Sequence, residues 1–167
     1  MICACSGSRP QNFPWNYHSG IYALYRAELR RRLQDLIDRG AEEFVVGMAR
    51  GADTDIAEEV IALKDEGVKV RLYCVIPYVG QTDGLSAAER SRYDYILSRA
   101  DGSETLFPLF RRDCFHARNR RMVDRSDMLF AVWNGKQTGG TASTVRYAVK
   151  QGKPHELFDL RDFLWSE

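Results

Sequence analysis

The sequence predicts an α/β protein with a Rossmann-like three-layer sandwich, in which a mostly parallel sheet has helices on both faces. Short apolar segments rich in β-branched residues alternate with longer segments whose apolar residues recur at helical spacing. Strands separated by helices form parallel sheets through right-handed crossovers. No repeat, linker or change of composition divides the 167 residues, so a single domain spanning 1–167 is expected.

The first half of the chain contains three predicted strands and two predicted helices. The strands are residues 1–6, 44–46 and 68–76. A helix is expected over residues 22–39, where apolar side chains recur at helical spacing until Gly40 ends the pattern. The second helix is expected to follow Asp53, which can cap it, and to end at Gly67.

The second half continues the alternation. Helices are expected at residues 86–99 and 113–125, and strands at residues 105–107, 128–133 and 155–160. The run 128–133 is wholly apolar, which is typical of a central strand that is buried on both faces. A last helix has an apolar face made of Ala142, Val145, Ala148 and Val149 and is closed by Gly152.

Charge and hydropathy exclude several classes of function. The chain has 24 Lys and Arg against 23 Asp and Glu, so its formal charge is +1 and any recognition of an anion must be local. The apolar run 128–133 is far shorter than the roughly 20 residues that cross a bilayer, so no membrane segment is expected. The first ten residues lack the features of a secretory signal, and a cytoplasmic location is expected.

The cysteines and histidines do not predict a metal site. The four cysteines include no C-x-x-C pair, and only three histidines accompany them. Cys3 and Cys5 lie two residues apart in a predicted strand, where they share a face and are expected to pack as small apolar side chains. No metal or cofactor is predicted.

Three loops that follow predicted strands have residues suited to binding an anion. Glycine permits a close approach of the backbone, arginine forms paired hydrogen bonds with phosphate, and the start of a helix favours negative charge. The candidate residues are Gly7, Ser8 and Arg9 in the first loop, Gly47, Arg50, Gly51 and Asp53 in the second, and Gly139, Gly140 and Thr141 in the third. Because their strands are expected to lie side by side, we expect one shared anion site at the carboxyl edge of the sheet.

Each loop also has a purely structural interpretation. The first is compatible with a tight turn bearing a surface arginine, the second with a helix that Asp53 caps, and the third with a flexible loop capped by a threonine. Neither the dinucleotide fingerprint G-x-G-x-x-G nor the P-loop G-x-x-x-x-G-K-[ST] is present. An ordinary NAD-dependent dehydrogenase or nucleotide triphosphatase is therefore not indicated.

Taken together, the motifs resemble the YpsA-like bacterial proteins of the SLOG superfamily. The motifs are GSRP, Phe-Pro-Trp at 13–15, GMARGAD, Ile-Pro at 76–77 with Gln81, Arg-Asn at 118–119, MVDRSDMLFAVWNG and GGT, and they run from residue 7 to about 160. The resemblance implies a Rossmann-like fold that binds a nucleotide or a nucleotide-derived, ADP-ribose-like ligand, in a sensing or regulatory role. It adds Pro77, Gln81, Arg118 and Asn119 to the candidate ligand-binding residues.

One relative of this family suggests an enzyme. The segment 118–122, Asp127 and the later T-G-G-T are similar to the LOG-type phosphoribohydrolases, which cleave the N-glycosidic bond of nucleoside monophosphates, and Arg118 falls on their catalytic arginine. Their glutamate shortly after the threonine is missing, since residues 142–144 are Ala-Ser-Thr. A hydrolase would have to recruit Asp53, Asp124 or Asp127. Asp127 is expected to be structural, so catalytic residues stay unassigned.

Another relative suggests a nucleic-acid-binding module. GMARGAD is similar to a loop of the DprA proteins, which bind single-stranded DNA, and residues 111–125 hold six arginines and two aspartates. Arg118, Arg121 and Arg125 are expected on one side of a helix, with Met122 and Phe115 on the other. A solvated basic face explains this pattern, with Arg118 and Asn119 kept for the ligand pocket because they occupy the family motif. Few aromatic side chains lie nearby for base stacking, so nucleic acid is not the favoured partner.

Aromatic residues near the loops could stack on a base. Trp15, in a loop that contains proline, is expected to line a ligand or to face a partner, whereas Trp133 at a strand end fits the core nearly as well. The residues Phe13 and Tyr17 accompany Trp15. Association of two or more copies through helices that flank the sheet is a further expectation from the superfamily.

Overall fold

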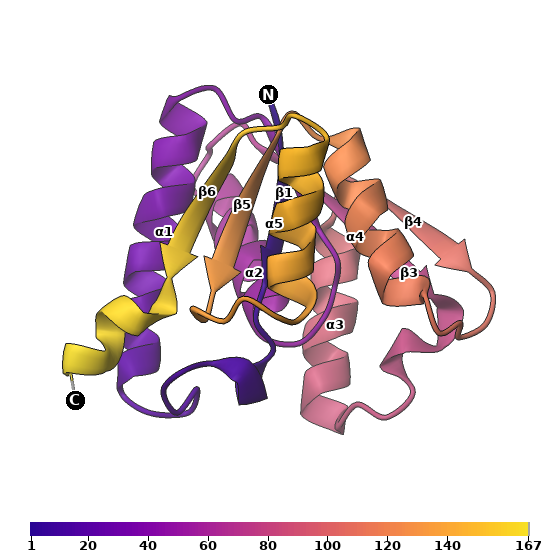
Figure 1. The fold of residues 1–167 in the computed structure, drawn as a ribbon, viewed down its shortest axis with the longest axis horizontal. Coiled ribbons are helices and arrows are strands. Elements are labelled where there is room, and N and C mark those ends of the chain that lie inside the picture. Colours follow the sequence, from indigo (N-terminus) through magenta and orange to yellow (C-terminus); the bar gives the residue numbers. More distant parts are fainter. Residues whose placement is uncertain (167) are drawn as a thin grey trace.

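A computed structural model describes residues 1–166 and contains a six-stranded sheet between two layers of helices (Figure 1). The strands are β1 (Ile2–Gly7), β2 (Glu43–Val46), β3 (Arg71–Tyr78), β4 (Gly102–Phe107), β5 (Met128–Trp133) and β6 (His155–Asp159). Their spatial order is β4-β3-β2-β1-β5-β6, and each neighbouring pair is parallel. The predicted Rossmann-like three-layer architecture is confirmed.

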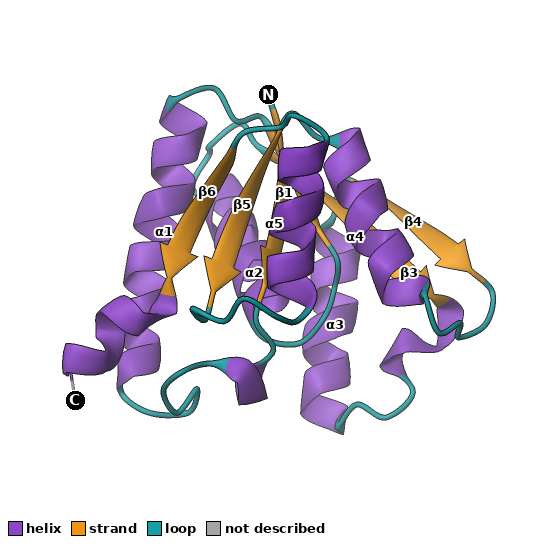
Figure 2. Ribbon diagram, in the orientation of Figure 1, coloured by secondary structure: helices purple, strands orange, loops and turns teal. Residues whose placement is uncertain are grey.

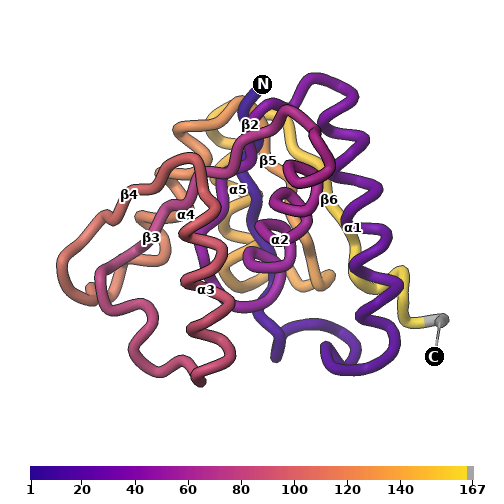
Figure 3. Tube along the Cα trace, turned by 180° about the vertical axis from the view of Figure 1, so that it is seen from behind, coloured from indigo at the N-terminus to yellow at the C-terminus, as the bar shows by residue number. Residues whose placement is uncertain are grey.

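The order in which the strands are added decides which face of the sheet each helix covers. They are α1 (Ile21–Asp38), α2 (Ala52–Asp65), α3 (Ala87–Arg99), α4 (Cys114–Arg125) and α5 (Gly140–Lys150), with short 3₁₀ helices η1 (Pro10–Asn12), η2 (Val79–Thr82) and η3 (Leu160–Ser166). The chain builds β1 to β4 in one direction and then returns to add β5 and β6 on the other side of β1. Right-handed crossovers therefore place α1, α2 and α3 on one face and α4 and α5 on the other (Figures 2 and 3).

The sheet has an apolar core on each face. Residues of β1 alternate between the two, since Cys3 and Cys5 pack in the larger core under α1 and α2, whereas Ala4 packs in the smaller core under α4 and α5. Both cysteines are fully buried and unpaired, which confirms their predicted role as small apolar side chains. Strand β5 is buried from Met128 to Val132, so the prediction of an interior strand is also confirmed.

A buried carboxylate connects the three helices α1, α2 and α3 that cover one face of the sheet. Asp55 of α2 is fully buried and accepts hydrogen bonds from the hydroxyls of Tyr17, Tyr22 and Tyr25 at 2.7–3.0 Å. The Nη2 atom of Arg92, on α3, approaches the same carboxylate at 2.7 Å. Burial and the negative charge of Asp55 raise the pKa of Tyr25 well above its usual value, so this hydroxyl remains a donor.

The structure corrects several local predictions. The N-cap of α2 is Gly51 rather than Asp53, whose side chain instead accepts a hydrogen bond from the backbone N–H of Ala49. Val149 was expected on the apolar face of the last helix, but it is 56% exposed. The third and fourth strands were expected at 68–76 and 105–107 and are observed at 71–78 and 102–107.

Trp15 belongs to the core, so the expectation that it lines a ligand or faces a partner was wrong. Trp15 is 5% exposed, and its Nε1 atom donates a hydrogen bond to the carbonyl oxygen of Leu160 at 2.9 Å. Its ring contacts Phe13 and Tyr25, with ring centroids 5.1 and 5.6 Å away. A tryptophan that meets its hydrogen-bond requirement in a buried cluster is unavailable to a ligand or a partner.

Among residues 1–166, no helix combines the length and apolar composition needed to cross a membrane.

The start of α2 is held against the end of β1. The backbone N–H of Ala52 donates to the carbonyl oxygen of Ser8 at 3.1 Å, and the N–H of Ser8 donates to the carbonyl oxygen of Val132 at 3.2 Å. Gly51 allows this contact because its φ is +91° and an added Cβ would lie 2.5 Å from the oxygen of Ser8. Gly7 is equally restricted, since a Cβ there would lie 2.3 Å from that of Ala52.

Replacement of Gly51 by alanine tests this contact. We expect Gly51→Ala to lower the free energy of unfolding by more than about 2 kcal/mol, because it adds a collision to an unfavourable φ. Gly67→Ala is the matched control, since Gly67 has φ +90° with nothing within 4 Å of the added Cβ, and it should cost about 1 kcal/mol. Urea unfolding of both variants measures the difference, and equal losses would contradict the account.

Candidate functional site

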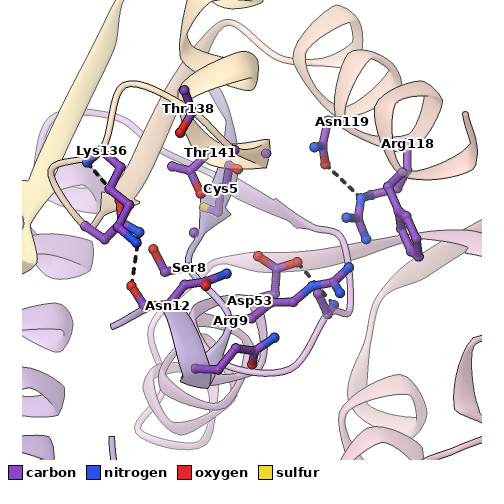
Figure 4. A pocket seen from close by; sticks show the side chains of 18 residues that line it. Cys5, Ser8, Arg9, Asn12, Asp53, Arg118, Asn119, Lys136, Thr138 and Thr141 are labelled. Carbon is purple, nitrogen blue, oxygen red and sulfur yellow. Dashed lines mark hydrogen bonds between the residues drawn. The ribbon is translucent and has the colours of Figure 1, made fainter. Parts of the chain in front are cut away.

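A pocket of about 410 Å³ lies at the carboxyl edge of the sheet, above β1 and β5 (Figure 4). The strand order reverses between these two strands, which is where open α/β sheets bind ligands. Three predicted loops meet there, as expected from β2, β1 and β5 being neighbours. The lining residues are Cys5, Ser6, Gly7, Ser8, Arg9, Gln11, Asn12, Ala49, Asp53, Phe115, Arg118, Asn119, Asn134, Lys136, Thr138, Gly139, Gly140 and Thr141.

The start of α5 presents backbone donors to this pocket. The N–H groups of Gly140 and Thr141 have no hydrogen-bond partner within residues 1–166, as is usual for the first turn of a helix. Gly139 has φ +100°, and a Cβ there would meet nothing within 4 Å, so the approach to these amides is open. The corresponding end of α2 is covered by residues 8–10, and its first N–H is already bonded to Ser8. Of the two helix starts, that of α5 is therefore the one suited to an anion.

Arg118 extends from α4 into the same pocket, although only 5% of the residue is exposed. Its Nη1 atom donates to the carbonyl oxygen of Gly47 at 2.6 Å, and its Nε atom donates to Oδ1 of Asn119 at 2.8 Å. Burial lowers the pKa of this guanidinium, which the negative charge of Asp53 partly opposes. These two bonds fix the guanidinium, whose remaining Nη2 atom has no protein partner within residues 1–166.

Asp53 places a buried carboxylate among these donors. Figure 4 shows it in the middle of the labelled side chains, between Ser8 and Arg118. The residue is 5% exposed, and one carboxylate oxygen accepts a hydrogen bond from the N–H of Ala49 at 3.2 Å. Burial raises the pKa of Asp53 to about 6, and the positive charges of Arg118 and Arg9 limit the increase.

Several lining residues were not among the predicted site residues. Asn134 donates to the carbonyl oxygen of Asn12 at 3.0 Å and accepts from the N–H of Lys136, which ties the third loop to η1. Phe115 contributes an aromatic wall, and the guanidinium carbon of Arg9 lies 5.0 Å from its ring centroid. Asn134 and Lys136 stand in the loop that the sequence singled out, whereas nothing in the sequence pattern indicates Asn12.

The structure divides the arginines of the basic segment. Arg118 was expected on the same helix side as Arg121 and Arg125 but was kept for the ligand pocket, and it faces inward together with Met122. Arg121 is exposed and pairs with Glu104 at 2.7 Å, while the half-buried Arg125 pairs with Glu43 at 2.8 Å. The helix therefore has a basic outer side, and one of its arginines is turned into the pocket.

Of the three acids that a hydrolase would have to recruit, only Asp53 lines the pocket. Asp124 accepts a hydrogen bond from the hydroxyl of Tyr147 at 2.7 Å. Asp127 accepts one from the N–H of Ile2 at 2.7 Å, at the amino ends of β1 and β5, which is the structural role expected for it. Within residues 1–166, no group of three or more His, Cys, Asp and Glu side chains is arranged to hold a metal ion.

A family model described as the YspA SLOG family, YpsA, matches residues 6–161. The chain belongs to this family. UPF0398 proteins of Bacillus thuringiensis (strain Al Hakam) and Bacillus anthracis (strain A0248) are each 29% identical to it over 161 residues, which cover 91% of this chain and 87% of each relative. A solved structure of DNA processing protein A from Helicobacter pylori has a similar fold, with a TM-score of 0.63 and 18% sequence identity. The match covers 99% of this chain and 72% of that one, and that protein is described as having a single-stranded DNA binding mode.

The structure separates the residues that the YpsA motifs single out. Arg9, Arg118, Asn119 and the start of α5 line the pocket above β1 and β5. Arg50, Gly51 and Gln81 line an adjacent pocket, and Arg50 is paired there with Glu89 at 3.1 Å. Pro77 is buried within β3 and lines neither. Gly47 lies behind Arg118, whose side chain would be 2.7 Å from an added Cβ. Arg9 and Arg118 thus share one pocket, and Arg50 does not.

The raised pKa of Asp53 predicts a pH-dependent stability. The folded protein holds this proton more tightly than the unfolded chain, so its free energy of unfolding should fall as the pH rises from about 4 to about 6 and then level off. Asp53→Asn should lack this fall and be more stable at pH 7.5, by up to about 3 kcal/mol.

Urea unfolding between pH 4 and pH 8 measures this effect. Asp83→Asn is the matched control, because Asp83 is an exposed carboxylate in the adjacent pocket. It should leave the pH profile of the wild-type protein unchanged. A wild-type profile in Asp53→Asn would show that the carboxylate is not held at a raised pKa.

Proposed function

We propose that the chain binds a nucleotide or a nucleotide-derived phosphorylated ligand in the pocket above β1 and β5, in a sensing or regulatory role. The observation that carries this proposal is the meeting of the buried Arg118 guanidinium, Arg9 and the open amides of α5 around one cavity. Arginine side chains and the start of a helix are the two groups that proteins commonly use to bind phosphate. The nearly neutral chain concentrates them at this edge of the sheet.

The charges of the pocket favour a phosphorylated ligand with hydroxyl groups over a simple anion. Three cations, Arg9, Arg118 and Lys136, line it together with the single carboxylate of Asp53. A carboxylate repels phosphate but accepts hydrogen bonds from hydroxyl groups. We therefore place phosphate near α5 and Arg9, and a sugar hydroxyl against Asp53. A ribose phosphate has both groups, whereas inorganic phosphate has only one.

Binding without chemical change is the role that the acids of the pocket support best. Glycoside hydrolysis commonly uses two carboxyl groups, one as an acid and one as a base or nucleophile. Within the described chain, Asp53 is the only carboxylate that lines this pocket. The burial of the Asp53 carboxylate destabilises the folded protein, and such costly burial of an ionisable group is typical of a functional site. In this proposal the carboxylate recognises the ligand.

Binding measurements with Arg9→Ala test the proposal. Isothermal titration with AMP and ADP-ribose should give binding to the wild-type protein, weakened about 10- to 100-fold in Arg9→Ala through loss of a charged hydrogen bond. Arg112→Ala is the matched control, because it removes the same charge from an exposed residue outside the pocket. It should bind like the wild-type protein.

Other outcomes would reject the proposal. Failure of every nucleotide to bind would contradict it outright. Salt-sensitive binding of single-stranded oligonucleotides without binding of any mononucleotide would instead favour a nucleic-acid module of the DprA kind.

A second candidate function is hydrolysis of the N-glycosidic bond, which the position of Asp53 beside Arg118 favours. In such a reaction the bond between C1′ and the base nitrogen breaks, the base leaves with the electron pair, and water adds to C1′ while Asp53 accepts its proton. A raised pKa suits a general base that operates near neutral pH.

Chromatography of AMP incubated with the protein distinguishes binding from hydrolysis. The proposal of binding without turnover predicts that no adenine is released by the wild-type protein. Release of adenine that Asp53→Asn abolishes, while AMP still binds to the variant, would establish the hydrolase instead. Asp83→Asn serves again as the control for the loss of one carboxylate.

A further inference from the structure

A second pocket, of about 530 Å³, lies beside the first and is lined differently. It is formed by the start of α2, the connection from β3 through η2 to α3, and α3 itself. Four of its lining residues have phenyl or phenol rings, namely Tyr17, Tyr78, Tyr93 and Phe115. The first pocket has only one such ring among its lining residues, Phe115, which belongs to both. The aromatic lining makes the second pocket suitable for a flat ring.

The charges in the second pocket are largely neutralised, in contrast to those in the first. Arg50 pairs with Glu89 at 3.1 Å, and Arg92 lies 2.7 Å from the buried carboxylate of Asp55 and also pairs with Glu58. Asp83 adds a further negative charge. Apart from Arg9 at its border with the first pocket, this pocket therefore lacks the excess of cations that a phosphate requires, and it is suited to an uncharged polar group.

Polar atoms that can recognise the edge of a ring are also present. The hydroxyl of Tyr93 donates to Oε1 of Gln81 at 3.1 Å, which orients the amide. The Nε2 atom of Gln81 makes one long bond of 3.4 Å to the carbonyl oxygen of Gly47, so its second hydrogen has no protein partner within residues 1–166. An amide held in this way can donate to a ring nitrogen or an exocyclic oxygen of a heterocycle.

Arg9 links the two pockets. It lines both, together with Ala49 and Phe115, and its guanidinium carbon is 5.0 Å from the centroid of the Phe115 ring. Unlike Arg50, it has no carboxylate partner among the residues that the structure describes. Arg9 thus lies between the polar first pocket and the aromatic second pocket. A cation in this position can bind the two phosphates that connect a nucleoside to a sugar.

We infer that the second pocket is a base-recognition subsite, so that the ligand is a nucleoside diphosphate sugar whose base lies among Tyr17, Tyr78 and Tyr93. Its phosphates lie between Arg9 and the start of α5, and its distal sugar lies near Asp53 in the first pocket. This inference rests on the proposed function, and it adds which part of the ligand each pocket takes. The buried residue Met48, with φ +62°, lies in the wall of the second pocket, and such backbone strain is common at binding sites.

Two ligands, one with a base and one without, test the inference. Titration calorimetry compares ADP-ribose with ribose 5-phosphate on the wild-type protein, Tyr78→Ala and Tyr95→Ala. Tyr78 is half-buried in the second pocket, whereas Tyr95 is an exposed tyrosine of α3 outside it. We expect Tyr78→Ala to weaken ADP-ribose about 10-fold or more, since a stacked base contributes this much, and to leave ribose 5-phosphate unchanged. Tyr95→Ala should change neither affinity.

The outcomes separate this inference from the proposed function. Failure of both ligands to bind to the wild-type protein would reject the proposed function and the base subsite together. Equal affinities of ADP-ribose for the wild-type protein and Tyr78→Ala, with binding intact, would reject the base subsite alone. Gln81→Ala is a second variant in case Tyr78→Ala does not fold, and it should also weaken only the ligand with a base.

Discussion

The contact between the end of β1 and the start of α2 is the constraint on which the site depends. The carbonyl oxygen of Ser8 accepts a hydrogen bond from the N–H of Ala52 at 3.1 Å, and the N–H of Ser8 donates one to the carbonyl oxygen of Val132 at 3.2 Å. This single residue therefore links β1 to its neighbour β5, where the strand order reverses, and to the start of α2. Only glycine at positions 7 and 51 leaves room for it. The contact sets the floor of the pocket and directs Asp53, in the first turn of α2, toward its centre.

The same contact determines how the cations and amides are distributed. Because Ser8 occupies the first N–H of α2 and residues 8–10 cover that helix start, the open amides at the edge are those of α5. Arg50 lines the adjacent pocket, where the carboxylate of Glu89 neutralises its charge. Arg9 remains between the two pockets without a carboxylate partner among the described residues. The edge of the sheet is thereby divided into a cationic pocket and an aromatic one.

Sequence patterns were sufficient for the fold and for the meeting of the glycine-rich loops at one edge of the sheet, but not for the arrangement of the side chains there. The alternation of strands and helices predicts the parallel sheet, and the glycine-rich loops predict which segments line the pocket, because both depend on local composition. Two side chains show the limit. Helical spacing puts Arg118 on the side of Arg121 and Arg125, and only the family resemblance kept it for the pocket, whereas the space left by Gly47 is what admits it to the interior. Trp15 was expected at a surface, yet the carbonyl group of Leu160, 145 residues away, holds it in the core. Both outcomes depend on contacts distant in sequence, which periodicity does not reveal.

Binding of a phosphate at the start of α5, between Arg9 and Arg118, can be measured by nuclear magnetic resonance. Titration of the ¹⁵N-labelled protein with ADP-ribose reports each backbone amide separately. Phosphate bound there should give the largest shifts at Gly139, Gly140 and Thr141, since these residues line the pocket and their N–H groups lack partners within residues 1–166. Shifts confined instead to the outer basic residues of α4 and α5, Arg120, Arg146 and Lys150, or no shifts at all, would contradict it.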